Sequence, residues 1–202
     1  VDGSGNPVRD KEIIDTELQL KDLETVDNRL RRVEKSAQVG GDKNAKTEYE
    51  VLKAYREALE QGKSARTVQF DTKEEQLAAR NLFLLTAKPV LYVCNVDEAS
   101  AATGNAYVEA VRRAVADEGA EILVVAAQTE ADIAELETYE ERQMFLKDVG
   151  LEESGCNRLI KAAYKMLNLE TFITAGEMEV KAWTYHKGWK APQCAGVIHT
   201  DF

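Results

Sequence analysis

Residues 88–98 read KPVLYVCNVDE, and this stretch decides how we interpret the fold. Its apolar part, which starts at Pro89, is rich in β-forming residues and too short for a typical helix, so we predict a buried strand. Strands that are apolar on both faces usually belong to parallel sheets. In open α/β sheets ligands bind outside the carboxyl ends of the strands, and Asn95 to Glu98 occupy such an end. The position suits a binding loop, although Asn95 and Asp97 are also common turn formers.

A second apolar stretch, residues 121–125, has the same character. Between the two stretches, apolar residues recur with helical spacing over residues 107–115. A strand, a helix and a strand within residues 88–125 have the length of a βαβ unit, whose strands run parallel. Residues 126–128 then lie at the same edge of the sheet as Asn95.

The N-terminal part predicts a pair of long helices. Residues 10–38 carry an apolar stripe with spacings of three and four, and a second stripe follows Gly40 and ends before Gly62. Two such helices with a short connection form an antiparallel hairpin. The first helix also carries a basic cluster, which is typical of a solvated face but also suits a partner contact: Arg29, Arg31, Arg32 and Lys35.

Further along the chain, the capping-box spacings at Thr72 and Thr138 predict two more helices. We expect the first of them to extend through Leu85 and another helix to cover residues 159–167. Residues 171–185 carry β-forming residues around a glycine and predict a hairpin. The chain opens on a residue other than Met and its last residues, from Ile198, read as strand-like, so we expect a piece of a longer protein.

The composition limits the classes of function. With 44% hydrophobic and 31% charged residues the chain is typical of a globular protein, and its formal charge of −10 argues against broad electrostatic attachment to DNA or to an anionic membrane. No apolar stretch approaches the length of a membrane span, and the polar N-terminus is not a signal peptide. Three widely spaced cysteines predict neither a disulfide framework nor a zinc site, which fits the cytoplasm.

Two short patterns are set aside. The letters GKS at residues 62–64 lack the glycine that a phosphate loop needs five positions earlier, where Glu57 stands within a predicted helix. His186 and His199 have no neighbouring metal ligands with a recognisable spacing, so no metal site is expected. No grouping of Ser, His and Asp has the pattern of a nucleophile elbow.

Several stretches resemble one known family, the YchF proteins or Obg-like ATPases. They are EIIDTELQLKDLETV, LTAKPVLYVCNVDE, EESGCNRLIKAAYKMLNLETFITAGEMEVKAWT and KAPQCAGVIHTDF. Together with Pro7 to Asp10 they are spread from the start of the chain to its end, so the resemblance covers nearly the whole chain, and the last two are the most specific. The resemblance implies an ATP-preferring member of the P-loop GTPase superfamily that is linked to the ribosome or translation.

The same resemblance implies an α/β fold in three parts. Residues 1–70 would form a helical coiled-coil arm, residues 71–168 the rear part of a nucleotide-binding domain with a parallel sheet, and residues 169–202 the beginning of a β-grasp TGS domain. The phosphate loop and the magnesium ligands would lie in a preceding segment. On this interpretation the longer parent is an ATPase, ATP is its ligand and Mg²⁺ enters only with the missing part. This chain would contain no catalytic residue and would hydrolyse no ATP alone.

The family comparison also assigns base-binding residues. In GTPases the loop after the first strand is N-K-x-D, and its aspartate accepts two hydrogen bonds from guanine. The matching loop here has Asn95, Val96 in place of the lysine and Glu98 in place of the aspartate. Glutamate is one methylene longer and does not reproduce that clamp, so adenine is expected. Ala127 and Gln128 would add main-chain N–H groups near the base.

A second set of residues could contact RNA. Lys181, Lys187 and Lys190 alternate with aromatic residues in the TGS portion, a pattern that suits nucleic acid, although half-buried aromatics on a β-grasp surface explain it equally. Ribosome or RNA binding through this portion and the helical arm follows from the resemblance. Two alternatives stay open: a non-enzymatic adaptor that uses the arm and the TGS portion, and a member that prefers GTP.

Overall fold

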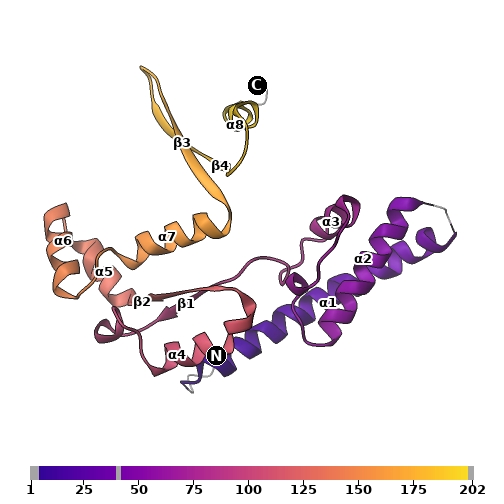
Figure 1. Ribbon diagram of the computed structural model, residues 1–202, viewed down its shortest axis with the longest axis horizontal. Coiled ribbons are helices and arrows are strands. Elements are labelled where there is room, and N and C mark those ends of the chain that lie inside the picture. The colour runs from indigo at the N-terminus through magenta and orange to yellow at the C-terminus, as the bar shows by residue number, and fades with distance from the viewer. Residues whose placement is uncertain (1–4, 40–41, 200–202) are drawn as a thin grey trace. The chain divides into compact units, whose positions relative to one another are not determined.

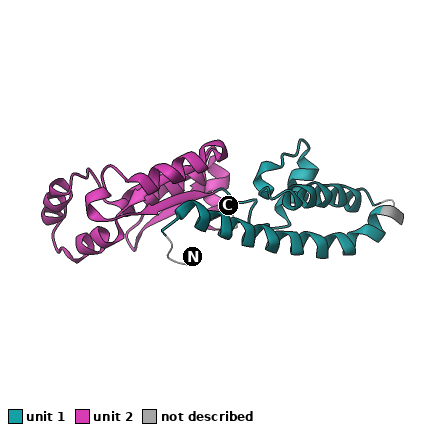
Figure 2. Cartoon of the chain, turned by 90° about the horizontal axis from the view of Figure 1, so that it is seen from below, with its two compact units in different colours: residues 1–89 teal, residues 90–202 magenta. Residues whose placement is uncertain are grey.

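The computed structural model describes residues 5–39 and 42–199, and its helices and strands gather into two compact units. Residues 1–89 contribute to the first unit and residues 90–202 to the second (Figure 2). The domain boundaries expected from the sequence, at residues 70 and 168, stay predictions. No described helix is both long enough and apolar enough to cross a membrane.

The first unit is built on two long helices that lie side by side, α1 (Pro7–Val39) and α2 (Lys43–Glu60) (Figure 1). Proline suits the first position of α1 because its missing N–H would have no partner there, and the Asn6 side chain accepts a bond from Arg9 N at 3.1 Å. The Asp42 side chain caps α2 in the same way. The predicted antiparallel pair is confirmed.

Apolar residues from the two helices meet those of the following segment in one core. This segment contains η1 (Ala65–Thr67) and α3 (Lys73–Arg80). Tyr55 meets the Phe70 ring edge-on, with 5.2 Å between the centroids, and burial raises the pKa of Tyr55 above its ordinary value. The buried members of the core are Val26, Val51, Leu52, Tyr55, Leu59, Ala65, Ala79 and Leu84.

The prediction that the α3 helix extends through Leu85 is wrong. The helix begins at its Thr72 capping box as expected, but it ends at Arg80, and Phe83 has a positive φ of 52°. The backbone N–H groups of Leu85 and Thr86 donate to the carboxylate of Asp22 in α1. Those N–H groups are therefore not available for helical hydrogen bonds.

Asp22 is a buried carboxylate that holds residues 85 and 86 against α1. Its side chain is 2% exposed and accepts from Leu85 N at 2.8 Å, from Thr86 N at 2.7 Å and from Thr86 Oγ1 at 2.7 Å. Thr86 Oγ1 in turn accepts from Ala65 N at 2.9 Å. Three charge-assisted hydrogen bonds compensate for the loss of water around the carboxylate.

The second unit contains the predicted βαβ arrangement. Strands β1 (Leu91–Asn95) and β2 (Glu121–Val125) pair in parallel, with Asn95 opposite Val125, and α4 (Ala106–Ala114) lies between them in the chain. The Asn105 side chain caps α4. Short turns η2 (Glu98–Ser100) and η3 (Ala116–Glu118) complete the connection. The parallel sheet expected from the sequence is confirmed.

The expectation that the first strand is buried on both faces is wrong for the described residues. Val93 is 47% exposed, whereas Leu123 on β2 is 9% exposed. In the part of the chain that the structure describes, β1 has one strand neighbour, β2. Apolar composition predicted the strand correctly, but the coverage of a strand depends on its neighbours.

Three helices follow the parallel strands: α5 (Ala127–Glu135), α6 (Tyr139–Asp148) and α7 (Gly155–Met166). The Thr138 capping box begins α6 as predicted, and α7 matches the helix expected at residues 159–167. The sequence interpretation did not foresee α5. Its first residue directly follows the Ala126 N-cap, whose side chain offers no capping oxygen, so the usual start signal is absent.

The last elements are β3 (Leu169–Ala175), β4 (Val180–His186) and α8 (Ala191–Ile198). The strands pair antiparallel, which confirms the predicted hairpin. The strand-like interpretation of the end is wrong for Ile198, which is the last residue of a helix that has a proline in its first turn. The rest of that stretch, from residue 200, lies outside the described residues.

We expect the Asp22→Asn substitution to destabilise the first unit by about 2–3 kcal/mol. Asparagine has an NH₂ group in place of one carboxylate oxygen, so a buried donor that bonded to that oxygen loses its acceptor. Thermal unfolding and amide exchange at Leu85 and Thr86 measure the effect. Asp27→Asn is the matched control, since Asp27 pairs with the exposed Arg56 at 3.1 Å and its loss costs at most about 1 kcal/mol. Equal effects of the two substitutions would contradict the role of Asp22.

Candidate nucleotide-base site

The carboxyl ends of β1 and β2 bring the two predicted loops together. Asn95, the last residue of β1, pairs in register with Val125, and its Oδ1 accepts a hydrogen bond from the backbone N–H of Ala127 at 3.0 Å. Ala127 is the first residue of α5, whose N-cap, Ala126, has no side-chain oxygen. Asn95 thus caps α5 from the neighbouring strand.

This bond determines which side of the Asn95 amide is available to a ligand. Only the oxygen of the amide accepts hydrogen bonds, so the contact with Ala127 N–H assigns Oδ1 to α5 and leaves Nδ2 as the donor for a ligand. Asn95 is exposed, and within the described residues its Nδ2 donates to no other group. We call the two loops at the carboxyl ends of β1 and β2, residues 95–98 and 126–128, the rim. The rim therefore presents a side-chain N–H donor, Asn95 Nδ2.

Two backbone N–H groups of these loops donate within the protein. Val96 N–H donates to Val125 O at 2.9 Å, and Ala127 N–H donates to Asn95. The Ala127 N–H thus donates within the protein in this arrangement, and its predicted contact with a base stays a prediction. Gln128 N–H lies in the first turn of α5, where N–H groups have no partner inside the helix, and remains a candidate. The Gln128 side chain donates to Asp132 Oδ1 at 3.0 Å.

Val96 and Glu98 lie on the other side of Asn95. Val96 is half-buried and supplies an apolar side chain beside the rim, whereas Glu98 is exposed and begins η2. Asp97 caps that turn, with its Oδ1 accepting from Ser100 N at 2.9 Å. The turn-forming role that the sequence left open thus applies to Asp97, while Asn95 caps a helix and keeps a free donor.

Hydrogen bonds that the sequence analysis did not predict connect the elements next to the rim. The Glu130 carboxylate in α5 accepts from Gly155 N at 2.5 Å and from Cys156 N at 3.0 Å, so it caps the start of α7. Arg158 in α7 donates to Val124 O at 2.7 Å. These bonds connect α5, α7 and β2, and no short motif in the sequence announces them, because the partners are 25–34 residues apart.

Gly155 is required by close packing. A Cβ at this position would lie 2.9 Å from Glu130 Oε1 and 2.9 Å from Val125 Cγ1. Val125 pairs with Asn95, so a larger residue at position 155 would press directly on the strand that carries the rim. The glycine therefore allows α7 to approach the end of β2.

The three lysines that the sequence assigned to RNA are spread along the C-terminal hairpin. Lys181 lies over the Trp183 ring at 4.1 Å, Lys187 pairs with Glu170 at 3.6 Å, and Lys190 is the N-cap of α8. Six positions separate Lys181 from Lys187, roughly 20 Å along an extended chain. Lys181 therefore lies near the start of β4 and Lys187 directly after its end.

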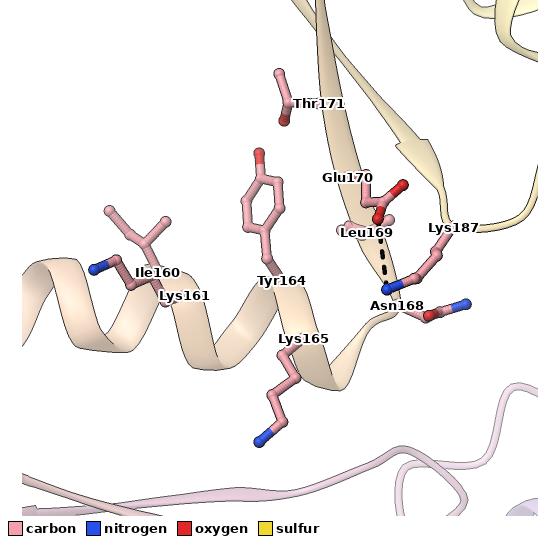
Figure 3. A pocket seen from close by; sticks show the side chains of 9 residues that line it. All are labelled: Ile160, Lys161, Tyr164, Lys165, Asn168, Leu169, Glu170, Thr171 and Lys187. Carbon is pink, nitrogen blue, oxygen red and sulfur yellow. Dashed lines mark ion pairs between the residues drawn. The ribbon is translucent and has the colours of Figure 1, made fainter.

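A pocket of about 590 Å³ lies between α7 and the start of β3 (Figure 3). Tyr164 rises from α7 toward Thr171, and its hydroxyl lies 3.2 Å from Thr184 Oγ1, a hydrogen bond that lowers the pKa of the tyrosine. Three lysines line it, and each has an acidic partner: Lys161 with Glu153, Lys165 with Glu121 and Lys187 with Glu170. These pairs neutralise the pocket's positive charge.

Two further features of the described residues concern metal binding and phosphate binding. There, no group of three or more His, Cys, Asp or Glu side chains is placed to hold a metal ion. The GKS letters fall between α2 and η1, where Gly62 has a φ of 70° and Lys63 Nζ donates to Gln61 Oε1 at 3.0 Å. The element directly before them is the helix α2 and not a strand, so this is not a phosphate loop.

Comparison with known proteins finds relatives that align with the whole length of this chain. The chain is 51% identical over 204 residues to the ribosome-binding ATPase YchF of Bacillus subtilis, an alignment that covers 100% of this chain and 55% of that protein. The chain is a homologue of the YchF proteins. It is also 48% identical over 202 residues to the ribosome-binding ATPase YchF of Escherichia coli O157:H7, covering 100% of this chain and 54% of that one. The chain thus spans about half the length of the curated relatives that it matches.

More distant comparisons show the same similarity to YchF proteins. Obg-like ATPase 1 of Caenorhabditis elegans is 38% identical over 205 residues, covering 100% of this chain and 51% of that protein. The solved structure of the Schizosaccharomyces pombe YchF GTPase superposes with a TM-score of 0.85 at 32% identity, covering 100% of this chain and 55% of that one. A family model described as YchF-GTPase_C, protein of unknown function (DUF933), matches residues 169–202.

We expect Gly155→Ala to lower the free energy of unfolding of the second unit by about 1–3 kcal/mol, since the added methyl overpacks the contact among α5, α7 and β2. Gly196→Ala in α8 is the matched control, because alanine favours a helix and its methyl group would meet no atom within 4 Å among the described residues, apart from its chain neighbours and the nearby helix backbone. Thermal denaturation followed by circular dichroism compares the two. A Gly155→Ala variant as stable as Gly196→Ala would contradict the packing argument.

Proposed function

We propose that this chain supplies the base-binding rim of an ATP-binding, ATP-hydrolysing P-loop protein that associates with the ribosome. The observation that carries the proposal is the Ala127 N–H to Asn95 Oδ1 hydrogen bond, which joins the two rim loops and leaves a directed donor. The names of the relatives, ribosome-binding ATPases, support the activity and the partner. We expect the protein to act in the cytoplasm.

Adenine suits the groups at the rim. Its N7 is an acceptor that Asn95 Nδ2 can bind, and its exocyclic amine is a donor for the second lone pair of Asn95 Oδ1. Val96 would lie against the apolar face of the ring, and the Gln128 N–H is a further donor at the start of α5. These are contacts of this chain's own residues that orient the purine, while ATP brings the reactive phosphates.

The preference for ATP over GTP depends on Glu98. Guanine has a ring N–H and an amine that an aspartate can bind with both oxygens at once, and such charged hydrogen bonds contribute about 1.5–3 kcal/mol. Glu98 begins η2, whose geometry is set by the Asp97 cap, so its longer side chain does not occupy the position of an aspartate carboxylate at that point of the loop. Without the clamp, guanine loses its advantage.

Catalysis is assigned to residues outside this chain. Phosphoryl transfer requires groups that position the phosphates, Mg²⁺ and the attacking water. The rim residues supply none of these, so their part is to bind and orient the base. The polypeptide that contains this chain and spans the full length of its relatives, called the longer protein below, would carry the activity.

Two alternative functions predict different experimental results. The S. pombe homologue is named a GTPase, which favours a GTP-preferring member. A non-enzymatic adaptor would use α1, α2 and the C-terminal hairpin for docking and would bind ribosomes equally with and without nucleotide. Ribosome co-sedimentation of the longer protein with ATP, with GTP and without nucleotide separates these alternatives from the proposal.

We expect Asn95→Asp in the longer protein to weaken ATP binding about fivefold or more, because the carboxylate lacks the Nδ2 donor and repels the acceptor N7. The substitution keeps an oxygen to cap α5, so the melting temperature should change little. Isothermal titration with ATP measures the affinity. Asp97→Asn is the control, since that side chain caps η2 at Ser100; unchanged ATP affinity in Asn95→Asp would overturn the proposal.

We expect Glu98→Asp in the longer protein to raise the affinity for GTP relative to ATP by about tenfold, because aspartate restores the shorter carboxylate that binds guanine. Competition between labelled ATP and GTP measures this ratio. Glu109→Asp makes the same chemical change on an exposed face of α4 and serves as the control. An unchanged ratio in Glu98→Asp would remove the explanation based on side-chain length.

A further inference from the structure

The helical pair is divided into an acidic half and a basic half. Residues 10–28, near the start of α1, contain seven acidic residues and two lysines. Residues 29–53, on both sides of the connection between α1 and α2, contain seven basic and four acidic residues. The basic set is Arg29, Arg31, Arg32, Lys35, Lys43, Lys46 and Lys53. A chain with a net charge of −10 thus concentrates positive charge at one end of its helical pair.

We call residues 29–37 and 43–53 the distal surface. Two of its cations have close partners within the helical pair: Arg29 with Glu48, and Lys53 with Glu50 at 3.7 Å. The others are exposed and form no ion pair with another side chain in the described part of the chain: Arg31, Arg32, Lys35, Lys43 and Lys46. The distal surface therefore keeps charge that its own acids do not neutralise, unlike the pocket beside α7.

A groove of about 300 Å³ crosses this region where α1 meets α2. Arg31 of α1 and Lys53 and Arg56 of α2 line it, together with Tyr49. Lys53 lies 5.7 Å from the centre of the Tyr49 ring, so the aromatic ring supports a cation at the groove. The acidic lining residues are Asp27, which pairs with Arg56 at 3.1 Å, and Glu34.

The distal surface lacks the apolar anchors typical of a protein interface. The large exposed hydrophobic side chains of α1 are Ile14, Leu18 and Leu20, all in the acidic half, and within the described residues none falls in the distal surface. Interfaces between proteins usually bury aromatic or aliphatic residues and have few charges at their centre. A surface of exposed arginines and lysines without such residues fits a polyanion.

We propose that the distal surface docks on the phosphodiester backbone of RNA, an inference that rests on the proposed ribosome association. Arginine guanidinium groups bind phosphate oxygens with two parallel N–H donors, and Arg31 and Arg32 present two such groups beside Lys35. Contacts with phosphates position a protein without reading the sequence of bases. The acidic half of the helical pair repels the same backbone, so the charge division restricts docking to the distal end.

The test compares two triple substitutions in the longer protein. Arg31→Gln, Arg32→Gln and Lys35→Gln remove three distal charges, whereas Lys73→Gln, Arg80→Gln and Lys147→Gln remove three exposed charges elsewhere. Binding to purified ribosomal RNA is measured over a range of salt concentrations, and ribosome binding is measured by co-sedimentation. We expect the distal variant to lose RNA affinity by at least about tenfold and the slope of log K against log salt to decrease by about 2.

Each outcome has one interpretation. Equal losses in the two variants, or no loss in either, would overturn the proposal, because the effect would then follow net charge or be absent. Loss of ribosome binding with unchanged RNA binding would assign the surface to an acidic protein and would also overturn it. ATP affinity, measured in the same distal variant, should equal that of the unsubstituted protein; a defect of the base rim itself appears instead in Asn95→Asp.

Discussion

The hydrogen bond from the Ala127 N–H to Asn95 Oδ1 connects the ends of the two parallel strands. It completes the first turn of α5, it fixes the orientation of the Asn95 amide, and it brings two loops that are 32 residues apart in the chain into one rim. The bond is possible only because β1 and β2 are parallel and in register at Asn95 and Val125. A shift of one residue would turn the Asn95 side chain to the opposite face of the sheet.

The supporting contacts show how such a rim is kept in place. Glu130 uses both carboxylate oxygens to cap α7, and Gly155 allows α7 to approach Val125. Asn95 caps α5 with its oxygen, and in the proposed function it binds the base with its nitrogen.

The net charge of the chain does not show how its charged residues are distributed along the helical pair. The net charge of −10 led us to exclude broad attachment to nucleic acid, yet the basic residues of the helical pair gather at its distal end while their acidic counterparts gather at the other. Electrostatic attraction acts over about a Debye length, roughly 8–10 Å in physiological salt, so a local surface can attract a polyanion that the whole molecule would repel. Composition alone is therefore a weak guide to partners.

The sequence by itself determined the elements whose signals are local, whereas only the tertiary structure decided which groups meet. The apolar spacing of α1 and α2 and the capping boxes at Thr72 and Thr138 each lie within a few residues, and the structure contains all of them. Asp22, by contrast, binds the N–H of Thr86 from 64 residues away, and Asn95 uses the Ala127 N–H that the sequence had assigned to a ligand. Spacing along the chain encodes periodicity and caps, because these involve neighbours. Hydrogen bonds between distant residues depend on strand register and helix packing, so the competition for each donor and acceptor becomes visible only in the folded molecule.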